Sequence, residues 1–175
     1  MAKRYEIVSK GGVLSTVPPV AVVWLEGDFP KPAEPPARVE IAQKNFVFEP
    51  ALLPIRVGTQ VAFPNQDSEY HNVFSYSKTK RFDLGRYLPG ETPVPTETFD
   101  QAGSVVLRCD IHEHMKAIII VVDSPLFLTT DTAGNFEFDG VPPGTYTVKA
   151  WVNSKTTLQT STTITADQAS TTINF

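Results

Sequence analysis

The chain has little of what marks several common protein classes. It contains one cysteine, so no disulfide can form within it. Its longest apolar runs, VAVVWL and AIIIVV, have six residues each and are far too short to span a bilayer. Its 15 basic and 19 acidic residues are interspersed, so no basic stripe is present. These absences argue against a disulfide scaffold, a membrane-spanning segment and a nucleic-acid partner.

A helical hydrophobic period is also missing. Fifteen prolines and ten glycines interrupt the 175 residues at short intervals, and no window of a dozen residues repeats its apolar positions as a helix does. Between these breaks lie short runs rich in β-branched and aromatic residues, which are AVVWL, RVEIAQ, TQVAFPN, HNVFSYS, SVVLRC, AIIIVV, NFEFDG, GTYTVKAW and TTLQTSTTI. Such runs predict an all-β protein built from sandwiches or barrels. The length suits one large domain or two small ones.

What the chain does contain is a concentration of soft metal ligands. The segment RCDIHEHMKAIII (108–120) holds the only cysteine, two of the three histidines and one of the two methionines, and the third histidine lies upstream in SEYHNVFS. A copper ion that alternates between Cu(I) and Cu(II) is well held by two imidazoles and one thiolate, with a weak axial thioether. His71, Cys109, His112 and Met115 supply this donor set.

The spacing of these residues supports one shared site. Cys109 ends a β-run, and the following DIHEHM is too short for a helix, so we expect a tight loop before the next strand. That loop can turn three donors towards one point, and His71 would arrive from a different strand. Rigid strands on both sides would keep the donors in place when the charge of the metal changes.

The pattern FPNQDSEYHNVFS followed by C-x2-H-x2-M ahead of a strand resembles the cupredoxins, the small blue-copper electron-transfer proteins. Plastocyanins, pseudoazurins and amicyanins share this plan, and the short loop has the amicyanin-like spacing. The resemblance covers about Arg38 to Asp123, roughly half of the chain. It implies a Greek-key β-sandwich or barrel for this part.

The same resemblance implies roles for individual residues. His71, Cys109 and His112 would be equatorial copper ligands, and Met115 would be the axial ligand. Asn72 would make outer hydrogen bonds that steady the ligand loop.

Two other metal sites stay open at this stage. His114 could point to solvent or compete for the metal, and Glu113 could supply an oxygen ligand, as in the red-copper relative nitrosocyanin. A hydrolytic zinc site would need an open coordination position and a general base, for which Glu113 is the one candidate.

The C-terminal part resembles a different fold. The segment TTDTAGNFEFDGVPPGTYTVKAW carries the D-x-x-G-x-F and G-V-P-x-G-x-Y pattern of carboxypeptidase-regulatory or transthyretin-like β-sandwiches. The aromatic residues Phe136, Phe138, Tyr146 and Trp151 are its expected core, and the strand that usually accompanies it, PVAVVWLEG, lies at the other end of the chain.

We therefore expect a discontinuous second domain. Residues 37–123 would form the cupredoxin, inserted into a small sandwich made of 1–36 with 124–175. Neither flank alone offers enough residues for a core, and insertion is tolerated where the ends of the inserted domain lie close together. A tandem layout, with the N-terminal strand added to the cupredoxin sheet, is the alternative.

Together these patterns predict a type 1 (blue) copper protein that carries one electron between redox partners and is not an enzyme. His112 would be the electron port, because the resemblance places the loop histidine near the surface in an apolar patch. MAKRYEIVSKGG lacks the apolar core of a signal peptide, so either the protein is cytoplasmic or a signal was removed. The expected location is periplasmic or otherwise extracytoplasmic, because copper electron carriers work there. Copper delivery and a β-sandwich interaction module with a vestigial site are the other hypotheses.

Overall fold

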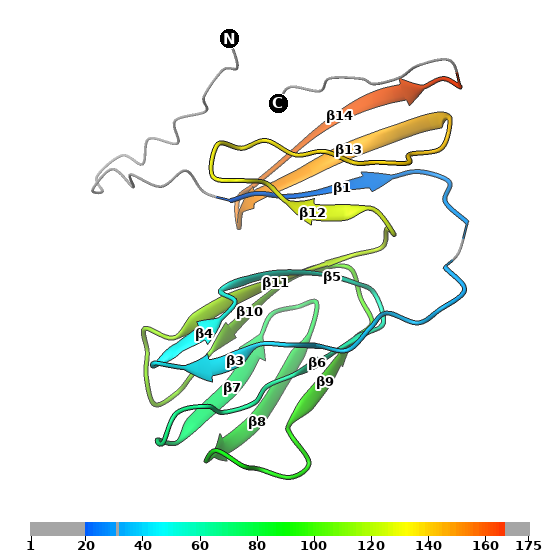
Figure 1. Ribbon diagram of the computed structural model, residues 1–175. Helices are drawn as coiled ribbons and strands as arrows, with labels where there is room; N and C mark the ends of the chain where they lie inside the picture. The colour runs from blue at the N-terminus through cyan, green and yellow to red at the C-terminus, as the bar shows by residue number, and fades with distance from the viewer. Residues whose placement is uncertain (1–19, 31, 167–175) are drawn as a thin grey trace, which may run out of the picture. The chain divides into compact units, whose positions relative to one another are not determined.

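The computed structural model describes residues 20–30 and 32–166, and this part of the chain is all-β (Figure 1). It contains fourteen strands and no helix, so the fold-class prediction is confirmed. Within these residues no helix therefore has the length and apolarity needed to cross a membrane. The chain divides into a terminal unit, Met1–Pro30 with Leu126–Phe175, and a central unit, Lys31–Pro125.

The central unit is built around a five-stranded sheet with the order β5-β11-β10-β7-β8. Its strands are β5 (Leu52–Arg56), β7 (His71–Tyr76), β8 (Arg81–Tyr87), β10 (Gly103–Arg108) and β11 (Lys116–Val122). Strands β10 and β11 are antiparallel, with Arg108 opposite Lys116, so residues 109–115 form the connection between two adjacent strands. The expected tight loop after Cys109 is present.

Two smaller sheets complete the central unit. The three-stranded sheet has the order β2-β6-β9 and consists of β2 (Val39–Glu40), β6 (Thr59–Ala62) and β9 (Thr96–Phe99). The two-stranded sheet pairs β3 (Ala42–Lys44) with β4 (Val47–Glu49). Asn45 and Phe46 join these two strands with positive φ angles of 54° and 59°, as a two-residue hairpin turn requires.

Strand alternation accounts for the core of the central unit. Burial alternates along β10, which places Val105 and Leu107 on one face, and Ala117, Ile119 and Val121 of β11 belong to the same core. The other face of β11 is also covered near its end, where Ile120 and Val122 are buried. The same core continues past the end of β10, where it includes Cys109 and Met115. The ligand loop therefore begins and ends in close-packed surroundings.

The described residues of the terminal unit form one four-stranded sheet with the order β12-β1-β13-β14. It consists of β1 (Val22–Glu26), β12 (Phe127–Thr129), β13 (Gly144–Asn153) and β14 (Thr156–Ile164). Val23 in β1 lies opposite Leu128 in β12 and Ala150 in β13, so the N-terminal strand lies between two strands from the C-terminal part. Independent folding of 37–123 and of 1–36 with 124–175 stays a prediction.

The expected strand over NFEFDG is wrong. Residues 135–139 have no regular secondary structure, and the turn lies just before them, where the Asp131 carboxylate accepts the N–H groups of Ala133 and Asn135. Phe136 and Phe138 pack against the core of the terminal unit as partly buried side chains, so side chains and not strand pairing attach the segment to the sheet. Of the other expected core aromatics, Tyr146 is buried and Trp151 is half-buried.

Candidate metal centre

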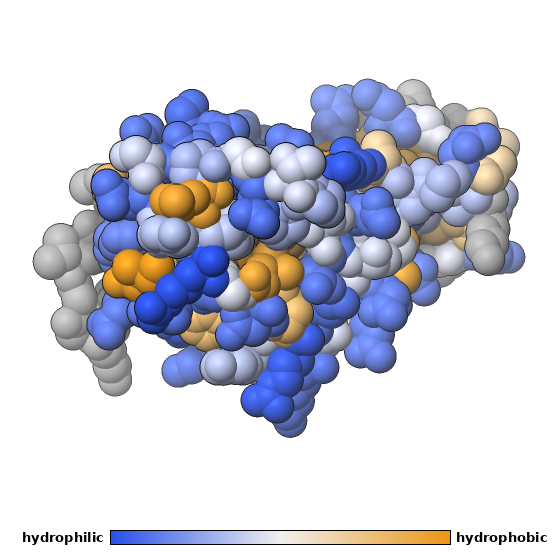
Figure 2. Space-filling model, turned by 90° about the horizontal axis from the view of Figure 1, so that it is seen from below, coloured by the Kyte–Doolittle hydropathy of each residue, from blue (hydrophilic) through white to orange (hydrophobic). Residues whose placement is uncertain are grey.

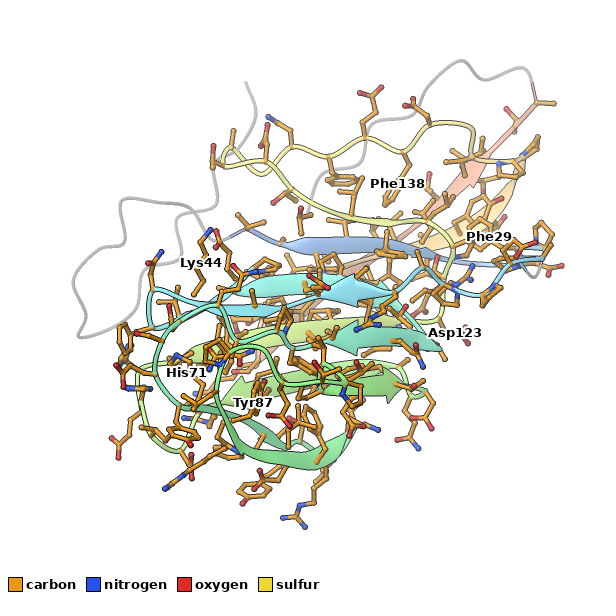
Figure 3. The ribbon with its side chains drawn as sticks, turned by 60° about the horizontal axis from the view of Figure 1, so that its bottom comes forward. Phe29, Lys44, His71, Tyr87, Asp123 and Phe138 are labelled. Carbon is orange, nitrogen blue, oxygen red and sulfur yellow. The ribbon has the colours of Figure 1, made fainter. Side chains whose placement is uncertain are left out.

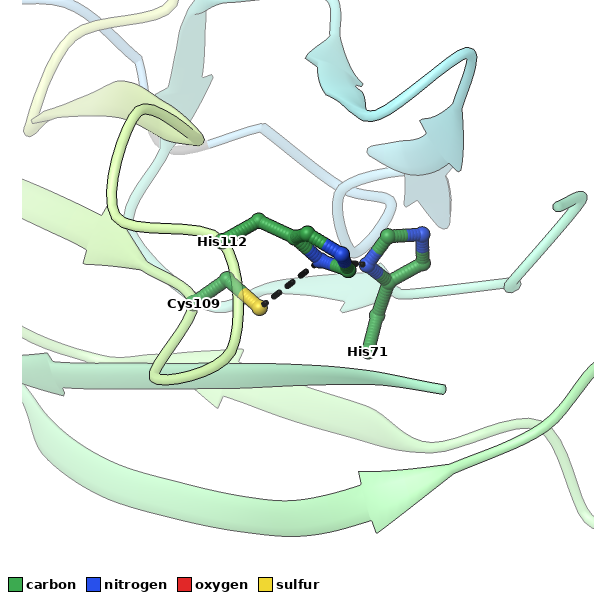
Figure 4. A group of neighbouring side chains, drawn as sticks. All are labelled: His71, Cys109 and His112. Carbon is green, nitrogen blue, oxygen red and sulfur yellow. Dashed lines mark hydrogen bonds between the residues drawn. The ribbon is translucent and has the colours of Figure 1, made fainter. Parts of the chain in front are cut away.

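The predicted ligands come from one strand and one loop. His71 is the first residue of β7, and Cys109 follows the last residue of β10. His112 and Met115 lie further along the loop, where the N–H of Met115 donates to the carbonyl of His112 at 2.9 Å. This hydrogen bond folds the loop back on itself, which turns the thiol of Cys109 and the ring of His112 to the same side (Figure 4).

The donor atoms of three of these residues converge. His112 Nδ1 lies 3.1 Å from His71 Nδ1 and 4.0 Å from Cys109 Sγ. One ligand atom from each of the three lies within 4.8 Å of the others, so one ion could contact all of them (Figure 4). Within the described residues this group contains no carboxylate.

Three of the four predicted ligands are out of contact with water. His71 is 0% exposed, Met115 1% and Cys109 3%, whereas His112 is half-buried. Met115 belongs to the same buried cluster as Cys109. The protein thus brings a thiol, two imidazoles and a thioether into one region, with access from solvent on the His112 side.

His71 is oriented by a carboxylate that the sequence reasoning missed. His71 Nε2 lies 2.8 Å from Asp67 Oδ2, which leaves Nδ1 facing Cys109 and His112. Burial raises the pKa of Asp67, but hydrogen bonds from Phe46, His71 and Asn45 outweigh it and hold that pKa below its usual range. An ionised carboxylate can only accept, so Nε2 of His71 carries the proton.

Tyr87, the last residue of β8, lies opposite His71 and holds this end of β7. Lys44, His71 and Tyr87 lie at one end of the central unit (Figure 3), and His71 pairs with Tyr87 across β7 and β8. The Tyr87 hydroxyl donates to the carbonyl of Phe63 at 2.8 Å. Burial raises its pKa, with a smaller opposing contribution from a hydrogen bond to Gln43, so the hydroxyl stays protonated and keeps this bond.

Asn72 does not do what the resemblance implied. Its side-chain amide donates to Asp83 Oδ1 at 2.7 Å and to the Gly85 carbonyl at 3.0 Å, and both partners are in β8. The Asn72 Oδ1 atom is buried without a hydrogen-bond partner in the described part of the chain. Asn72 therefore ties β7 to β8 and makes no hydrogen bond to the ligand loop.

The loop is instead tied to β8 by an ion pair. Arg86 donates from Nε and Nη2 to the carboxylate of Asp110, at 3.1 and 2.9 Å from Oδ2. Both side chains are exposed, so solvent screens the ion pair and it adds little to the stability of the fold. Its effect is geometric, because Asp110 directly follows Cys109.

The two residues considered as additional ligands lie outside the group of three. His114 Nε2 is hydrogen-bonded to the carbonyl of Phe46 at 2.9 Å, and Glu113 is exposed. The Phe46 ring lies edge-on to His71 and to His112, with centroid distances of 5.8 and 5.1 Å.

Apolar side chains are exposed near the half-buried histidine. Phe46 is 40% exposed, and Ile111, which precedes His112, is 37% exposed. Figure 2 shows one face of the molecule, on which small hydrophobic patches lie among hydrophilic side chains. The solvent side of the centre is therefore partly apolar.

Comparisons with known proteins gave one family match and several structural matches. A family model described as polysaccharide lyase family 4, domain II, matches residues 127–172. This agrees with a second small β unit, while its transthyretin-like assignment stays a prediction. A comparison with curated proteins found no match.

Solved structures similar to the chain include copper proteins. A copper-containing nitrite reductase (NirK) from Thermus scotoductus SA-01 is 29% identical, with a TM-score of 0.47 over 57% of this chain, which spans only 25% of the reductase. A purple cupredoxin from Nitrosopumilus maritimus is 23% identical, with a TM-score of 0.42, and the match covers 48% of this chain and 99% of that protein. Amicyanin from Paracoccus versutus is 22% identical, with a TM-score of 0.44, over 52% and 84% of the two chains.

Proposed function

We propose that the central unit is a cupredoxin-type domain that binds one copper ion and carries single electrons between redox partners. The observation that carries the proposal is the convergence of Cys109 Sγ with two imidazole Nδ1 atoms, at 4.0 and 3.1 Å, in a mostly buried site. Sulfur and nitrogen donors without a carboxylate suit copper in both of its oxidation states.

His71, Cys109 and His112 would hold the ion, with Met115 as the axial thioether. When bound, copper supplies one-electron redox chemistry. The chain keeps the ligands still: His71 is held by β7 and Asp67, and Cys109 by the end of β10. Because their burial also excludes water, little has to rearrange when the charge of the site changes.

His112 is the proposed route for the electron. It is the half-buried member of the group, and the exposed apolar residues Phe46 and Ile111 lie beside it. A redox protein that packs against these apolar side chains would come close to His112. We place the protein outside the cytoplasm, where a thiolate site meets fewer competing soft metals.

Two other functions fit the site less well. Hydrolysis at zinc needs an open position and a general base, but Glu113 is exposed and lies outside the group of donors. Delivery of Cu(I) needs ligands that exchange readily, whereas His71 and Cys109 are buried in the core. A carrier that retains its metal agrees better with this burial.

Addition of Cu(II) to the purified protein tests the proposal. Charge transfer from the Cys109 thiolate should give intense visible colour and a narrow copper hyperfine splitting in the electron paramagnetic resonance spectrum. Cys109→Ser should lose the colour, while circular dichroism shows that the fold is retained. A pale wild-type complex with ordinary tetragonal spectra would overturn the type 1 site.

A further inference from the structure

The turn between β3 and β4 has an unusual residue in it. Both of its central residues have positive φ angles, and such turns strongly favour Gly at the second position, because a side chain there meets the backbone. This chain has Phe46 there, at φ 59°. A bulky residue in this conformation is a local strain that neighbouring contacts must offset.

Asp67 supplies contacts of that kind. Its carboxylate accepts the backbone N–H of Asn45 at 2.6 Å and that of Phe46 at 2.9 Å. The same carboxylate accepts His71 Nε2 at 2.8 Å. Asp67 is itself anchored, because its N–H donates to Asn65 Oδ1, and the Asn65 amide donates to the carbonyl of Tyr87.

The carbonyl of Phe46 is held as well, by Nε2 of His114 at 2.9 Å. Residue 46 is therefore fixed through its N–H by Asp67 and through its carbonyl by the ligand loop. With its backbone fixed in this way, the ring lies edge-on to both His71 and His112, with an interplanar angle of 79° in each case. The ring is in place to restrict access to the donor atoms.

We propose that Asp67 is a positioning residue with two linked effects. It keeps the proton of His71 on Nε2, so that the Nδ1 lone pair faces the metal site, and it holds the Asn45–Phe46 turn so that the Phe46 ring covers the two histidines. The cover limits access of water and chelators to the centre, and it slows metal loss. Only the second effect, slower loss of the metal, rests on the proposed copper function.

The first effect is measurable without any metal. Long-range ¹H–¹⁵N correlation of the metal-free protein reports which imidazole nitrogen carries the proton. We expect the Nε2–H form for His71 in the wild type and a loss of that preference in Asp67→Ala. Glu69→Gln is the matched control, because it removes an exposed carboxylate from the same loop and should leave His71 unchanged. A predominant Nδ1–H form of His71 in the wild type would overturn the role of Asp67.

The second effect is measured with the copper-loaded protein, as the rate of copper loss to a chelator. Asp67→Asn keeps the side-chain shape but replaces one acceptor oxygen by a donor, so the three N–H groups that Asp67 accepts can no longer all be satisfied. We expect it to weaken copper retention by roughly tenfold to a hundredfold, the usual effect of losing a group that orients a ligand. Wild-type retention in Asp67→Asn would contradict the proposal.

Phe46→Gly separates a cover from a structural support. Glycine adopts the positive φ readily, so the melting temperature of the metal-free protein should hold or rise while copper loss becomes faster. A clear fall in melting temperature would show that the ring supports the fold, and it would overturn the proposal that the ring covers the two histidines.

The double variant Asp67→Asn/Phe46→Gly tests whether the two residues act together. Copper release should be no faster than in the faster single variant, because both changes act through one turn. Additive effects on the release rate would contradict a shared action. A protein that binds no copper at all would remove the proposed function, and the tautomer measurement would still decide the role of Asp67.

Discussion

The two units bury their side chains very differently. Among the residues that the structure describes, the core cluster of the central unit contains fifteen buried residues, whereas that of the terminal unit contains four, which are Val23, Leu25, Val148 and Ala150. Most of the buried polar side chains among the described residues also lie in the central unit, where those of Asn65, His71 and Asn72 make hydrogen bonds; in the terminal unit Thr130 accepts the N–H of Ala21. Burial of a polar group is costly unless it is hydrogen-bonded, so the deep core is where a preorganised polar site can be built.

The terminal unit is organised in another way. It is one sheet, and the segment 131–143 packs on it through partly buried side chains such as Phe136 and Phe138. Its sheet also depends on β1, which comes from the opposite end of the chain. We infer that the central unit has a larger free energy of unfolding than the terminal unit.

The largest effect is expected from separating the units. A fragment of residues 37–124 should fold and bind copper by itself, since its sheets need no strand from outside this range. A fragment of residues 124–175 should be unfolded until a peptide containing β1 is added, because β12 and β13 would lose the strand between them. Circular dichroism and thermal melting measure both. Cooperative melting of the C-terminal fragment alone would refute the discontinuous domain.

The next effect concerns only the ligand loop. His112→Ala should destroy the coloured copper site, because it removes one of the three convergent donors. His114→Ala should leave the position of the absorption bands in place, since His114 contacts the Phe46 carbonyl and lies outside the donor group. Visible absorption of the copper-loaded variants decides between them. If His114→Ala were the damaging change, the assignment of ligands would be wrong.

A leucine-to-alanine substitution in the core of each unit measures how differently the two cores are packed. Leu107 in β10 is 0% exposed in the central unit, and Leu25 in β1 is 4% exposed in the terminal unit. We expect Leu107→Ala to cost about 4 to 5 kcal/mol and Leu25→Ala about 3 kcal/mol, because a small core collapses more readily around a cavity. Chemical denaturation monitored by circular dichroism gives both values. Equal costs would remove the distinction between a deep and a shallow core.

The smallest effect is expected at the exposed turn of the terminal unit. Hydrogen bonds from the side chain and backbone of Asn135, with others from Ala133 and Gly134, lower the pKa of Asp131. Because its pKa is lower in the folded protein, the Asp131 carboxylate stabilises the fold at a pH above its pKa in the unfolded chain, which is about 4. This contribution is lost as the pH falls through the pKa of the folded protein. Asp131→Ala should therefore melt a few degrees below the wild type at pH 7, and the two curves should converge in acid. If the difference in melting temperature persisted at low pH, it would not come from the charge of Asp131.

Local patterns were enough for the class of fold, and they named the three donors that the structure brings together, His71, Cys109 and His112. Short runs of alternating apolar and polar residues between prolines and glycines predicted strands. Successive side chains of a strand point to opposite faces, so this pattern involves only residues that are near neighbours in the sequence. The loop after Cys109 was predictable for a similar reason, since six residues between two strands leave no room for a helix. NFEFDG shows the limit of this reasoning: it alternates like a strand, but Asp131 folds the chain before it into a turn and no neighbouring strand pairs with it.

The arrangement around the donors was decided by the tertiary structure. Nothing local shows that Asp67 meets His71 and the Asn45–Phe46 turn, because the contact joins a loop to a hairpin about twenty residues earlier. Asn72 follows a ligand in the sequence, yet alternation along β7 turns its side chain away from that of His71, and it bonds to β8. Residue types and spacing thus determined which atoms could bind a metal. The packing of separate strands decided which groups orient those atoms and which ring covers them, because such contacts depend on how distant segments are brought together.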